Sequence, residues 1–202
     1  MIRTVIFDLG RVIVPFDFMR GYRAMSEICG LSPDEIRGRL SASGLVVELE
    51  AGRIDEVEFN THAQEVLGTS MPREQFEAIW FSVFLPYTLI PESLVAGLRR
   101  NYRTVLLSNT NPVHFRGIRA NYPILDHFDA FVLSHEVGAM KPSPEIYQAA
   151  ILAAQCKPAE CFFTDDVAEY VEGARRAGMD AVLFEDAGQV ERELRARGVH
   201  WD

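Results

Sequence analysis

The hydrophobic pattern divides the chain into two ends in which strands alternate with helices and a middle part that is helical throughout. Apolar, largely β-branched runs at 2–7 and 12–14 predict strands near the start of the chain. From about residue 17 to 84, apolar residues such as Phe18 and Tyr22 recur at the spacing of one helix face. The sequence therefore predicts a helical block of about 70 residues, inserted just after the first strand.

Helix-start signals divide this block into separate helices. Asp17 precedes the first helix and is expected to be its N-cap. Ser32 is followed by Pro33 and two acids, which is the pattern of an N-cap, a proline at the first helical position and acids in the first turn. Two further amphipathic helices are predicted over 55–67 and 72–84.

Beyond Pro91, strands and helices alternate to the end of the chain. The predicted helices cover 92–100, 112–120, 144–155, 167–177 and 188–197, and the predicted strands cover 103–108, 130–134, 161–164 and 180–184. Such βαβ repetition implies a parallel sheet with helices on both faces. We therefore expect an α/β fold with a core domain formed by 1–14 and 88–202 and a helical cap subdomain formed by 15–87.

Polar residues follow four of the predicted strands. They are Asp8 after TVIF, Ser108 and Asn109 after TVLL, Lys141 after the run that ends in Leu133, and Asp165 and Asp166 after CFF. In a parallel sheet the carboxyl ends of the strands face one crevice, so residues distant in sequence meet there. A carboxylate, a hydroxyl, a lysine and an acidic pair in one crevice indicate phosphoryl transfer.

Each of these residue types has a chemical role in such a site. The Asp8 carboxylate could attack phosphorus and form an aspartyl-phosphate that water later hydrolyses. The Ser108 hydroxyl and the backbone N–H groups near Asn109 could hold the non-reacting phosphate oxygens. Lys141 could neutralise both the phosphate and Asp8. Any one of these strings alone is also ordinary turn, cap or surface chemistry, so the interpretation depends on the whole set.

The acidic pair Asp165 and Asp166 indicates a metal ion. Two adjacent carboxylates aimed at the crevice that holds Asp8 repel one another unless a cation lies between them. Mg²⁺ prefers oxygen ligands and keeps several waters, so Asp8, a backbone carbonyl, one carboxylate of the pair, a phosphate oxygen and water would complete its shell. The alternative interpretation of the pair is a solvated acidic turn.

Charge and composition narrow the class of protein. The 202 residues carry a formal net charge of −9, which argues against a general affinity for nucleic acid or an anionic membrane. No apolar run approaches the roughly 18 residues of a membrane span, and the apolar start is too short for a signal peptide. We therefore expect a cytoplasmic protein, monomeric or homodimeric. The cysteines fit neither a disulfide framework nor a zinc site, and three small buried thiols are expected: Cys29, Cys156 and Cys161.

Four stretches together resemble the haloacid dehalogenase superfamily of hydrolases, and within it the small bacterial phosphatases related to the N-terminal domain of soluble epoxide hydrolase. The stretches are FDLGRV at 7–12, LSNTN at 107–111, SHEVGAMKPSPEIY at 134–147 and FFTDD at 162–166. The resemblance implies a Rossmann-like, three-layer core with a helical cap. It also implies a Mg²⁺-dependent phosphatase that hydrolyses a small phosphate monoester of the sugar phosphate class through an aspartyl-phosphate.

The same resemblance assigns the metal ligands and exposes departures from the family pattern. It implies that Asp8, the Gly10 carbonyl and Asp166 bind the metal directly, with Asp165 acting through water. Gly10 stands where most of these phosphatases have an Asp that protonates the leaving oxygen and then activates water, a contribution of about 10²- to 10⁴-fold. Arg11, which replaces a small or amide residue, could contact substrate or narrow the pocket.

The missing acid has a consequence for substrate choice. Esters with stable leaving groups should react fastest, unless Asp17, His114 or the substrate itself supplies the proton. His114 is also a candidate for contact with substrate, because it starts a helix five residues beyond Asn109. The expected partner is a small phosphorylated metabolite.

Two other functions are compatible with these residues. A dehalogenase of the same superfamily displaces halide, also lacks an Asp at the position of Gly10 and needs no metal, but the acidic pair at 165–166 argues against it. A catalytically weak binding or regulatory protein could keep both the cap and the magnesium site.

Overall fold

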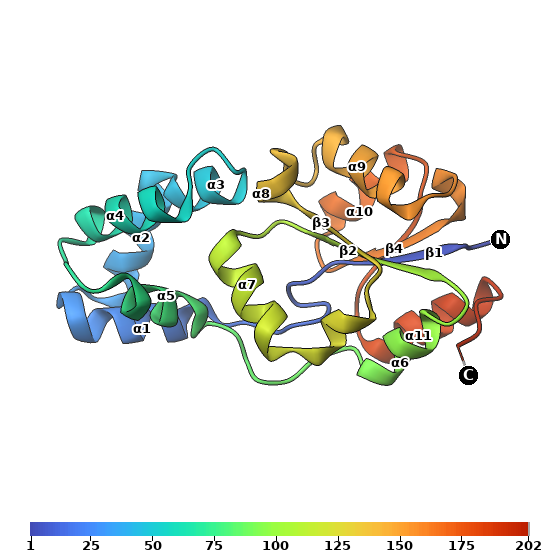
Figure 1. The fold of residues 1–202 in the computed structure, drawn as a ribbon, viewed down its shortest axis with the longest axis horizontal. Coiled ribbons are helices and arrows are strands. Elements are labelled where there is room, and N and C mark those ends of the chain that lie inside the picture. Colours follow the sequence, from blue (N-terminus) through green and yellow to red (C-terminus); the bar gives the residue numbers. More distant parts are fainter. Residues whose placement is uncertain (202) are drawn as a thin grey trace.

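The computed structural model describes residues 1–201 and contains a five-stranded parallel sheet between two layers of helices (Figure 1). The strands are β1 (Thr4–Phe7), β2 (Arg103–Ser108), β3 (Ala130–Leu133), β4 (Cys161–Asp165) and β5 (Asp180–Leu183), in the order β3-β2-β1-β4-β5. In the register of the sheet, Phe7 lies opposite Leu106 on one side and Thr164 on the other. All strands run the same way, so their carboxyl ends meet at one edge.

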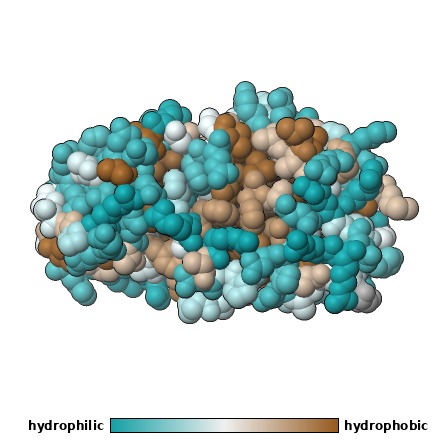
Figure 2. Space-filling view, in the orientation of Figure 1, coloured by the Kyte–Doolittle hydropathy of each residue, from teal (hydrophilic) through white to brown (hydrophobic). Residues whose placement is uncertain are grey.

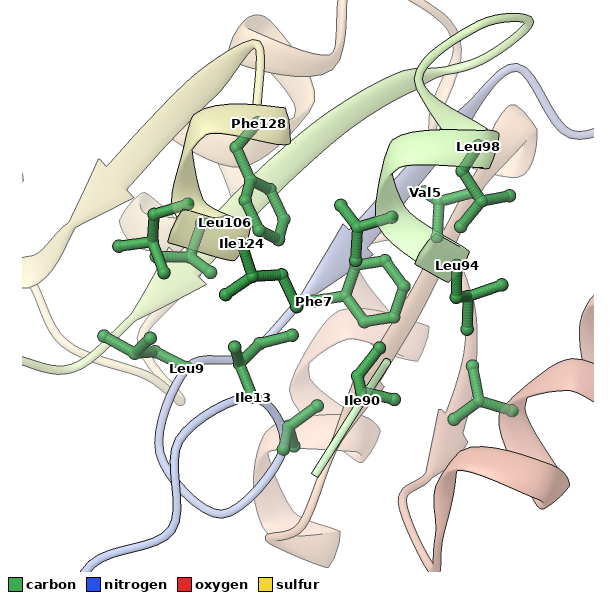
Figure 3. Close-up of a cluster of buried hydrophobic side chains, with 14 of the residues drawn as sticks. Val5, Phe7, Leu9, Ile13, Ile90, Leu94, Leu98, Leu106, Ile124 and Phe128 are labelled. Carbon is green, nitrogen blue, oxygen red and sulfur yellow. The ribbon is translucent and has the colours of Figure 1, made fainter. Parts of the chain in front are cut away.

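Different helices cover the two faces of the sheet. One face packs against α6 (Glu92–Leu98), α7 (Pro112–Asn121) and α11 (Ala187–Ala196), and the other against α9 (Pro144–Ala154) and α10 (Ala168–Arg176). In β1, Val5 and Phe7 pack near α6 (Figure 3), whereas Ile6 packs on the opposite face. All three are fully buried, which is why the strand reads as one continuous apolar run. The predicted three-layer α/β fold is confirmed.

The helical block forms its own bundle beside the sheet, which we call the cap. The cap contains α1 (Phe18–Cys29), α2 (Pro33–Ser43), α3 (Leu45–Glu50), α4 (Glu56–Leu67) and α5 (Arg73–Phe81). Its helices enclose a hydrophobic cluster around Phe59, Leu67 and Phe76 that is distinct from the two clusters on the sheet. Hydrophilic residues cover most of the cap surface drawn in Figure 2. The cap therefore has its own core.

Side-chain caps set where two of these helices begin, as the sequence predicts. Asp17 accepts a hydrogen bond from Met19 N at 2.9 Å and so caps α1. Ser32 and Glu35 form a reciprocal capping box at the start of α2. Such caps typically stabilise a helix by about 1 kcal/mol. Asp17 is thus engaged in a structural role at the helix start.

Some local predictions are wrong. Residues 12–14 are buried but form a turn rather than a strand, because the N–H groups of Ile13 and Val14 both donate to Leu9 O. The apolar run reflects burial in the core, not strand pairing. The hydrophobic pattern also fails to predict α3 and α8 (Ser134–Val137), since six and four residues are too few to show a helical period.

The structure also corrects expectations about burial. Cys161 is a buried free thiol, as expected, but Cys29 and Cys156 are only half-buried. Phe18, assigned by its spacing to an apolar helix face, is 45% exposed because it lies beside the crevice between cap and core instead of in the cap cluster. Across residues 1–201, no helix has the length and apolar character needed to cross a membrane.

Polar and close backbone contacts join the cap to the core. Arg116 on α7 donates to Glu56 on α4 at 2.8 Å and to Glu77 on α5 at 2.9 Å. Gly52, just after α3, packs so closely on α8 that a Cβ atom there would lie 2.2 Å from the His135 carbonyl oxygen. Accordingly, α3 and α8 lie side by side (Figure 1). Because α8 directly follows β3, this contact fixes the end of α3 near the carboxyl edge of the sheet.

Candidate active site

The floor of the crevice is a buried lysine held between two carboxylates. Lys141 Nζ donates to Asp8 Oδ1 at 2.6 Å and to Asp165 Oδ2 at 2.5 Å. Asp8 follows β1, Asp165 ends β4, and the two strands are neighbours. None of the three side chains is more than 8% exposed. The sheet topology therefore brings together three charged groups predicted from distant parts of the sequence.

Burial and ion pairing act in opposite directions on these groups. Burial raises the pKa of Asp8 to about 7, although the Lys141 ammonium opposes that rise. Burial alone would lower the pKa of Lys141, but the carboxylates of Asp8 and Asp165 outweigh burial and raise it. Lys141 is therefore charged at neutral pH. A further cation beside Asp8 would favour its ionised form.

Asp166 has different surroundings from its neighbour Asp165. Asp165 is fully buried, and its Oδ1 accepts a hydrogen bond from Val167 N at 2.9 Å. Asp166 is half-buried, lines the crevice and forms no salt bridge within residues 1–201. Burial and, to a smaller degree, the charge of Asp165 raise the pKa of Asp166. Of the acidic pair, Asp166 is the one free to bind a ligand.

Three carboxylates around one lysine form a donor set suited to a hard cation. Oxygen atoms of Asp8, Asp165 and Asp166 all lie within 4.8 Å of one another. With Lys141 charged, three ionised carboxylates would leave the cluster with an excess of negative charge. The Gly10 carbonyl, in the turn after Asp8, accepts no backbone hydrogen bond in the described part of the chain. Oxygen donors and uncompensated negative charge match Mg²⁺, so the residues present fit that ion.

Ser108, the last residue of β2, and Asn109, which follows it, have different tasks. The Asn109 side chain bonds both ways with the backbone of Lys141: Oδ1 accepts from N at 2.8 Å and Nδ2 donates to O at 3.0 Å. This amide therefore positions Lys141. The Ser108 hydroxyl makes only a long 3.3 Å hydrogen bond, to Asn109 O, among the described residues, so it can turn toward a ligand. Tyr170 covers the lysine with its ring, 5.0 Å from Nζ.

Above this floor lies a pocket of about 250 Å³. Its roof comes from the cap, from the segments that join cap and core, and from α7. The roof residues are Phe16, Phe18, Glu50, Phe84 and His114. Three of the five are phenylalanines, so the roof is less polar than the floor. The predicted residues Asp8, Gly10, Arg11, Ser108, Asn109, His114, Lys141 and Asp166 all line the pocket, while Asp165 lies beneath it.

The turn after Asp8 explains why position 10 is glycine. A Cβ atom on Gly10 would lie 2.9 Å from Phe16 Cε1, so the aromatic ring occupies the space that a side chain needs. The positive φ in this turn belongs to Arg11, at 58°, a conformation that side chains rarely adopt. The Arg11 guanidinium stacks on Phe16, 4.8 Å from the ring centroid. Arg11 thus lines the edge of the pocket, a position compatible with contact to substrate and with narrowing of the pocket.

His114 lines the pocket, but hydrogen bonds occupy both ring nitrogens. Its Nε2 lies 3.1 Å from Trp80 O, and its Nδ1 lies 3.1 Å from Asn111 Nδ2. Asn111 Oδ1 accepts from His114 N at 3.0 Å, so the amide nitrogen donates to Nδ1 and the ring carries its proton on Nε2. Burial lowers the pKa of His114 to about 4. At neutral pH the ring therefore has neither a spare proton nor a free acceptor.

Glu50 is a pocket residue that the sequence analysis missed. It is the last residue of α3 and reaches the pocket from the cap. Burial raises the pKa of Glu50 to about 7, against the effect of a hydrogen bond from the Asn111 side chain. Nothing in the sequence distinguishes it from Glu48, which pairs with Arg53 on the surface. The packing of α3 on α8 decides which acid turns inward.

Comparisons with known proteins agree with this geometry. A family model described as haloacid dehalogenase-like hydrolase matches residues 2–178. A D-ribitol-5-phosphate phosphatase of Bacteroides thetaiotaomicron is 28% identical over 96% of this chain and 97% of its own. A phosphatase of Mycobacterium tuberculosis is 32% identical over 100% of this chain and 97% of its own. The crystal structure of a haloacid dehalogenase (HAD) family enzyme from B. thetaiotaomicron, in complex with magnesium and inorganic phosphate, superposes with a TM-score of 0.83 at 28% identity. The match covers 92% of this chain and 96% of that enzyme's chain.

The match extends over most of the molecule. The residues matched by the family model run from β1 through α10 and include every residue of the pocket floor and the whole cap. Both curated relatives are matched almost from end to end. The chain is an enzyme, and it belongs to the haloacid dehalogenase-like hydrolases.

Proposed function

We propose that this hydrolase is a Mg²⁺-dependent phosphatase that cleaves a small phosphate monoester, of the sugar phosphate class, through an aspartyl-phosphate. The main support is the buried Lys141 between Asp8 and Asp165, with Asp166 beside them. A nucleophilic carboxylate, a fixed ammonium and oxygen donors for a hard cation are the groups that attack on an anionic phosphate requires.

The residues of the floor divide the work of phosphoryl transfer. Asp8 attacks the phosphorus atom, and Lys141 offsets the negative charge that gathers on Asp8 and the phosphate. Asn109 holds Lys141 in place through its backbone, at 2.8 and 3.0 Å. Ser108 donates its hydroxyl to a non-reacting phosphate oxygen. A bound magnesium ion would supply further positive charge at the phosphate oxygens.

The structure supports different roles for the two acids at the end of β4, Asp165 and Asp166. Both Asp165 oxygens already have partners, Lys141 Nζ and Val167 N, so this carboxylate would hold a bound metal through water. Asp166 has no such partner in the described chain and lines the pocket. Asp8, the Gly10 carbonyl and Asp166 are therefore the proposed direct ligands.

The pocket supports a small substrate. A volume of about 250 Å³ suits a metabolite and not a macromolecule. A relative matched over 96% of this chain is named for a sugar alcohol phosphate, which points to the same class of partner. We assign substrate selection to the cap, with domain limits of 15–87 for the cap and 1–14 with 88–202 for the core.

A hydrolysis screen tests this function. Purified enzyme is offered para-nitrophenyl phosphate and a panel of sugar and sugar alcohol phosphates, each with Mg²⁺ and with EDTA, and phosphate release is measured. Turnover that requires Mg²⁺ and is fastest with a small phosphate ester is the expected result. Release of halide from a haloacid, unaffected by EDTA, would instead identify a dehalogenase. Tight Mg²⁺ binding without turnover of any ester would identify a binding protein.

A further inference from the structure

The proposed reaction lacks an obvious proton donor for the leaving oxygen. When the ester is formed from an unactivated alcohol, the departing alkoxide oxygen needs a proton. General acid assistance at this oxygen is worth about 10²- to 10⁴-fold. Gly10 has no side chain, and Phe16 fills the space beside it. A donor supplied by the protein is therefore another group that lines the pocket.

We infer that Glu50, carried by the cap, is the general acid that protonates the leaving oxygen and afterwards accepts a proton from the attacking water. This inference rests on the proposed phosphatase function. It places the catalytic acid of this enzyme on the roof of the pocket instead of in the turn after the nucleophile.

Asp8 and Asp166 are assigned to the nucleophile and the metal, and four other protic side chains of the pocket are unsuited to this role. Both ring nitrogens of His114 are occupied, and its neutral ring has no proton to release. Arg11 carries a guanidinium, which does not act as an acid in proteins. Lys141 is held as an ammonium between two carboxylates. Tyr170 is a weak acid whose pKa burial raises further. Asp17 does not line the pocket and caps α1.

Glu50 has the surroundings of a carboxyl group that keeps its proton. It is mostly buried and forms no salt bridge within residues 1–201. Burial raises its pKa to about 7, so a large fraction of the group is protonated near neutral pH. The charged and titratable groups that share its pocket or lie on the packed helix α8 are Asp8, Arg11, His114, Lys141, Asp166, Tyr170, His135 and Glu136. The positive charge of Lys141 is paired mainly with the acids of the floor.

The core holds Glu50 in place even though the residue belongs to the cap. Asn111, two residues beyond Asn109, influences the pKa of Glu50, and its own side chain is fixed by hydrogen bonds with His114. The close packing of Gly52 on His135 fixes the backbone two residues away from Glu50. A group whose backbone is fixed against the core keeps a defined position relative to the phosphate site, as a general acid requires.

The two steps balance with Glu50 as the only proton carrier. In the first, an Asp8 oxygen bonds to phosphorus, the bond from phosphorus to the ester oxygen breaks, and that oxygen takes its electron pair and the Glu50 proton. The alcohol leaves and Glu50 is a carboxylate. In the second, water bonds to phosphorus and gives a proton to Glu50 while the bond to Asp8 breaks. Phosphate leaves, and both side chains return to their starting forms.

The test compares esters that need an acid with esters that do not. We would measure kcat/KM of wild type and Glu50→Gln for D-ribitol-5-phosphate, whose leaving group is an alkyl alcohol, and for para-nitrophenyl phosphate, whose leaving group is stable without a proton. Glu50→Gln should lower kcat/KM for the alkyl ester by about 10²-fold or more and change the value for the aryl ester by less than about 3-fold. Glu48→Gln, on the same helix but on the surface, is the matched control and should change neither.

The pH dependence of the ratio of the two kcat/KM values gives an independent readout. In wild type this ratio of alkyl to aryl ester should fall as pH rises through about 7, because Glu50 loses its proton there. In Glu50→Gln the ratio should be low and independent of pH. Glu50→Asp keeps a carboxyl group one carbon shorter and should restore part of the ratio together with its pH dependence, which a purely structural role would not produce.

Several outcomes would overturn the inference, and they differ from failure of the proposed function. Equal losses for both esters in Glu50→Gln would mean that Glu50 binds substrate or supports the fold. No loss for either ester would exclude it from the reaction. If wild type with Mg²⁺ cleaves neither these two esters nor any of the sugar phosphates, the phosphatase proposal itself fails, and the role of Glu50 fails with it.

Discussion

The floor and the roof of the pocket handle charge in opposite ways. The floor, at the carboxyl edge of the sheet, gathers three carboxylates and one lysine, and Lys141 pairs with Asp8 and Asp165 at 2.6 and 2.5 Å. The roof has only two titratable groups, Glu50 and His114, among aromatic rings, and burial favours the neutral form of each. The floor keeps its charges by pairing them, whereas the roof avoids charge.

This difference matches the two tasks of phosphate ester hydrolysis. Attack on an anionic phosphate needs fixed charges and a cation, which paired groups on rigid strand ends can hold. Departure of an alcohol needs a proton at neutral pH, which only a group with a pKa near 7 can give and take back. On the floor the carboxyl groups pair with Lys141 or, in the case of Asp166, are proposed to bind the metal, so the less polar roof is the better place for a proton donor.

The largest effect is expected from the nucleophile. Asp8→Asn should lower kcat by at least about 10³-fold, because an amide neither attacks phosphorus nor binds the metal with a full charge. Asp17→Asn is the matched control, since Asn caps a helix as well as Asp does and the residue lies outside the pocket. Steady-state rates with para-nitrophenyl phosphate measure both. A folded Asp8→Asn enzyme that keeps more than a few per cent of the wild-type rate would contradict the assignment.

The next effect separates Asp165 and Asp166, the two acids at the end of β4. Asp166→Ala should raise the Mg²⁺ concentration needed for half-maximal activity by about 10-fold or more while leaving the fold intact, because the residue is a proposed ligand without a protein partner. Asp165→Ala should instead lower the free energy of unfolding by roughly 3 kcal/mol, since it breaks a fully buried ion pair with Lys141.

Magnesium titrations and urea unfolding of both variants test this separation. EDTA should stop wild-type activity, and added Mg²⁺ should raise the Tm of wild type through binding linkage. A larger Mg²⁺ requirement in Asp165→Ala than in Asp166→Ala would show that the two roles are reversed. Activity that persists in EDTA would contradict the metal proposal for both.

The third prediction concerns a variant in which the general acid lies on the floor of the pocket instead of on its roof. In a Glu50→Gln background, Gly10→Asp combined with Phe16→Leu should recover about 10-fold of the lost kcat/KM for D-ribitol-5-phosphate, because the smaller side chain clears the contact at 2.9 Å and Asp at position 10 occupies the acid's usual place in the family. Phe16→Leu in the same background is the control and should recover nothing. A folded triple variant without recovery would mean that Glu50→Gln removes something other than an acid.

The sequence predicted the floor better than the roof for a physical reason. Asp8, Ser108 and Asp166 each follow a short apolar run, and in a parallel sheet the ends of such runs must meet at one edge. Their convergence follows from the topology alone. Even so, the tasks of individual groups needed the structure: the Asn109 amide holds the Lys141 backbone, a geometry that no spacing reveals.

The roof could not be predicted because its residues are placed by tertiary packing. Glu50 ends a helix of six residues, too short for a hydrophobic period, and it turns inward because Gly52 packs on α8. Phe18 has the spacing of a core residue and yet lines the crevice. The sequence also does not reveal that a side chain at position 10 would be crowded, because Phe16 contacts Gly10 only after the chain turns back between Leu9 and Val14.

The smallest expected effect tests whether the roof avoids positive charge as well as negative charge. The folded-state pKa of His114 is about 4, below the 6.5 of an unburied histidine, so the unfolded chain binds a proton before the folded protein does. His114 therefore contributes stability that is present above pH 6.5 and is lost as pH falls toward 4.

Between pH 7.5 and pH 5, wild type should lose about 2 kcal/mol more unfolding free energy than His114→Gln, measured by urea unfolding. His62→Gln, on an exposed histidine of the cap, should follow wild type. Equal losses in wild type and His114→Gln would mean that the roof accepts a charged imidazole, and the contrast between floor and roof would then apply to carboxyl groups alone.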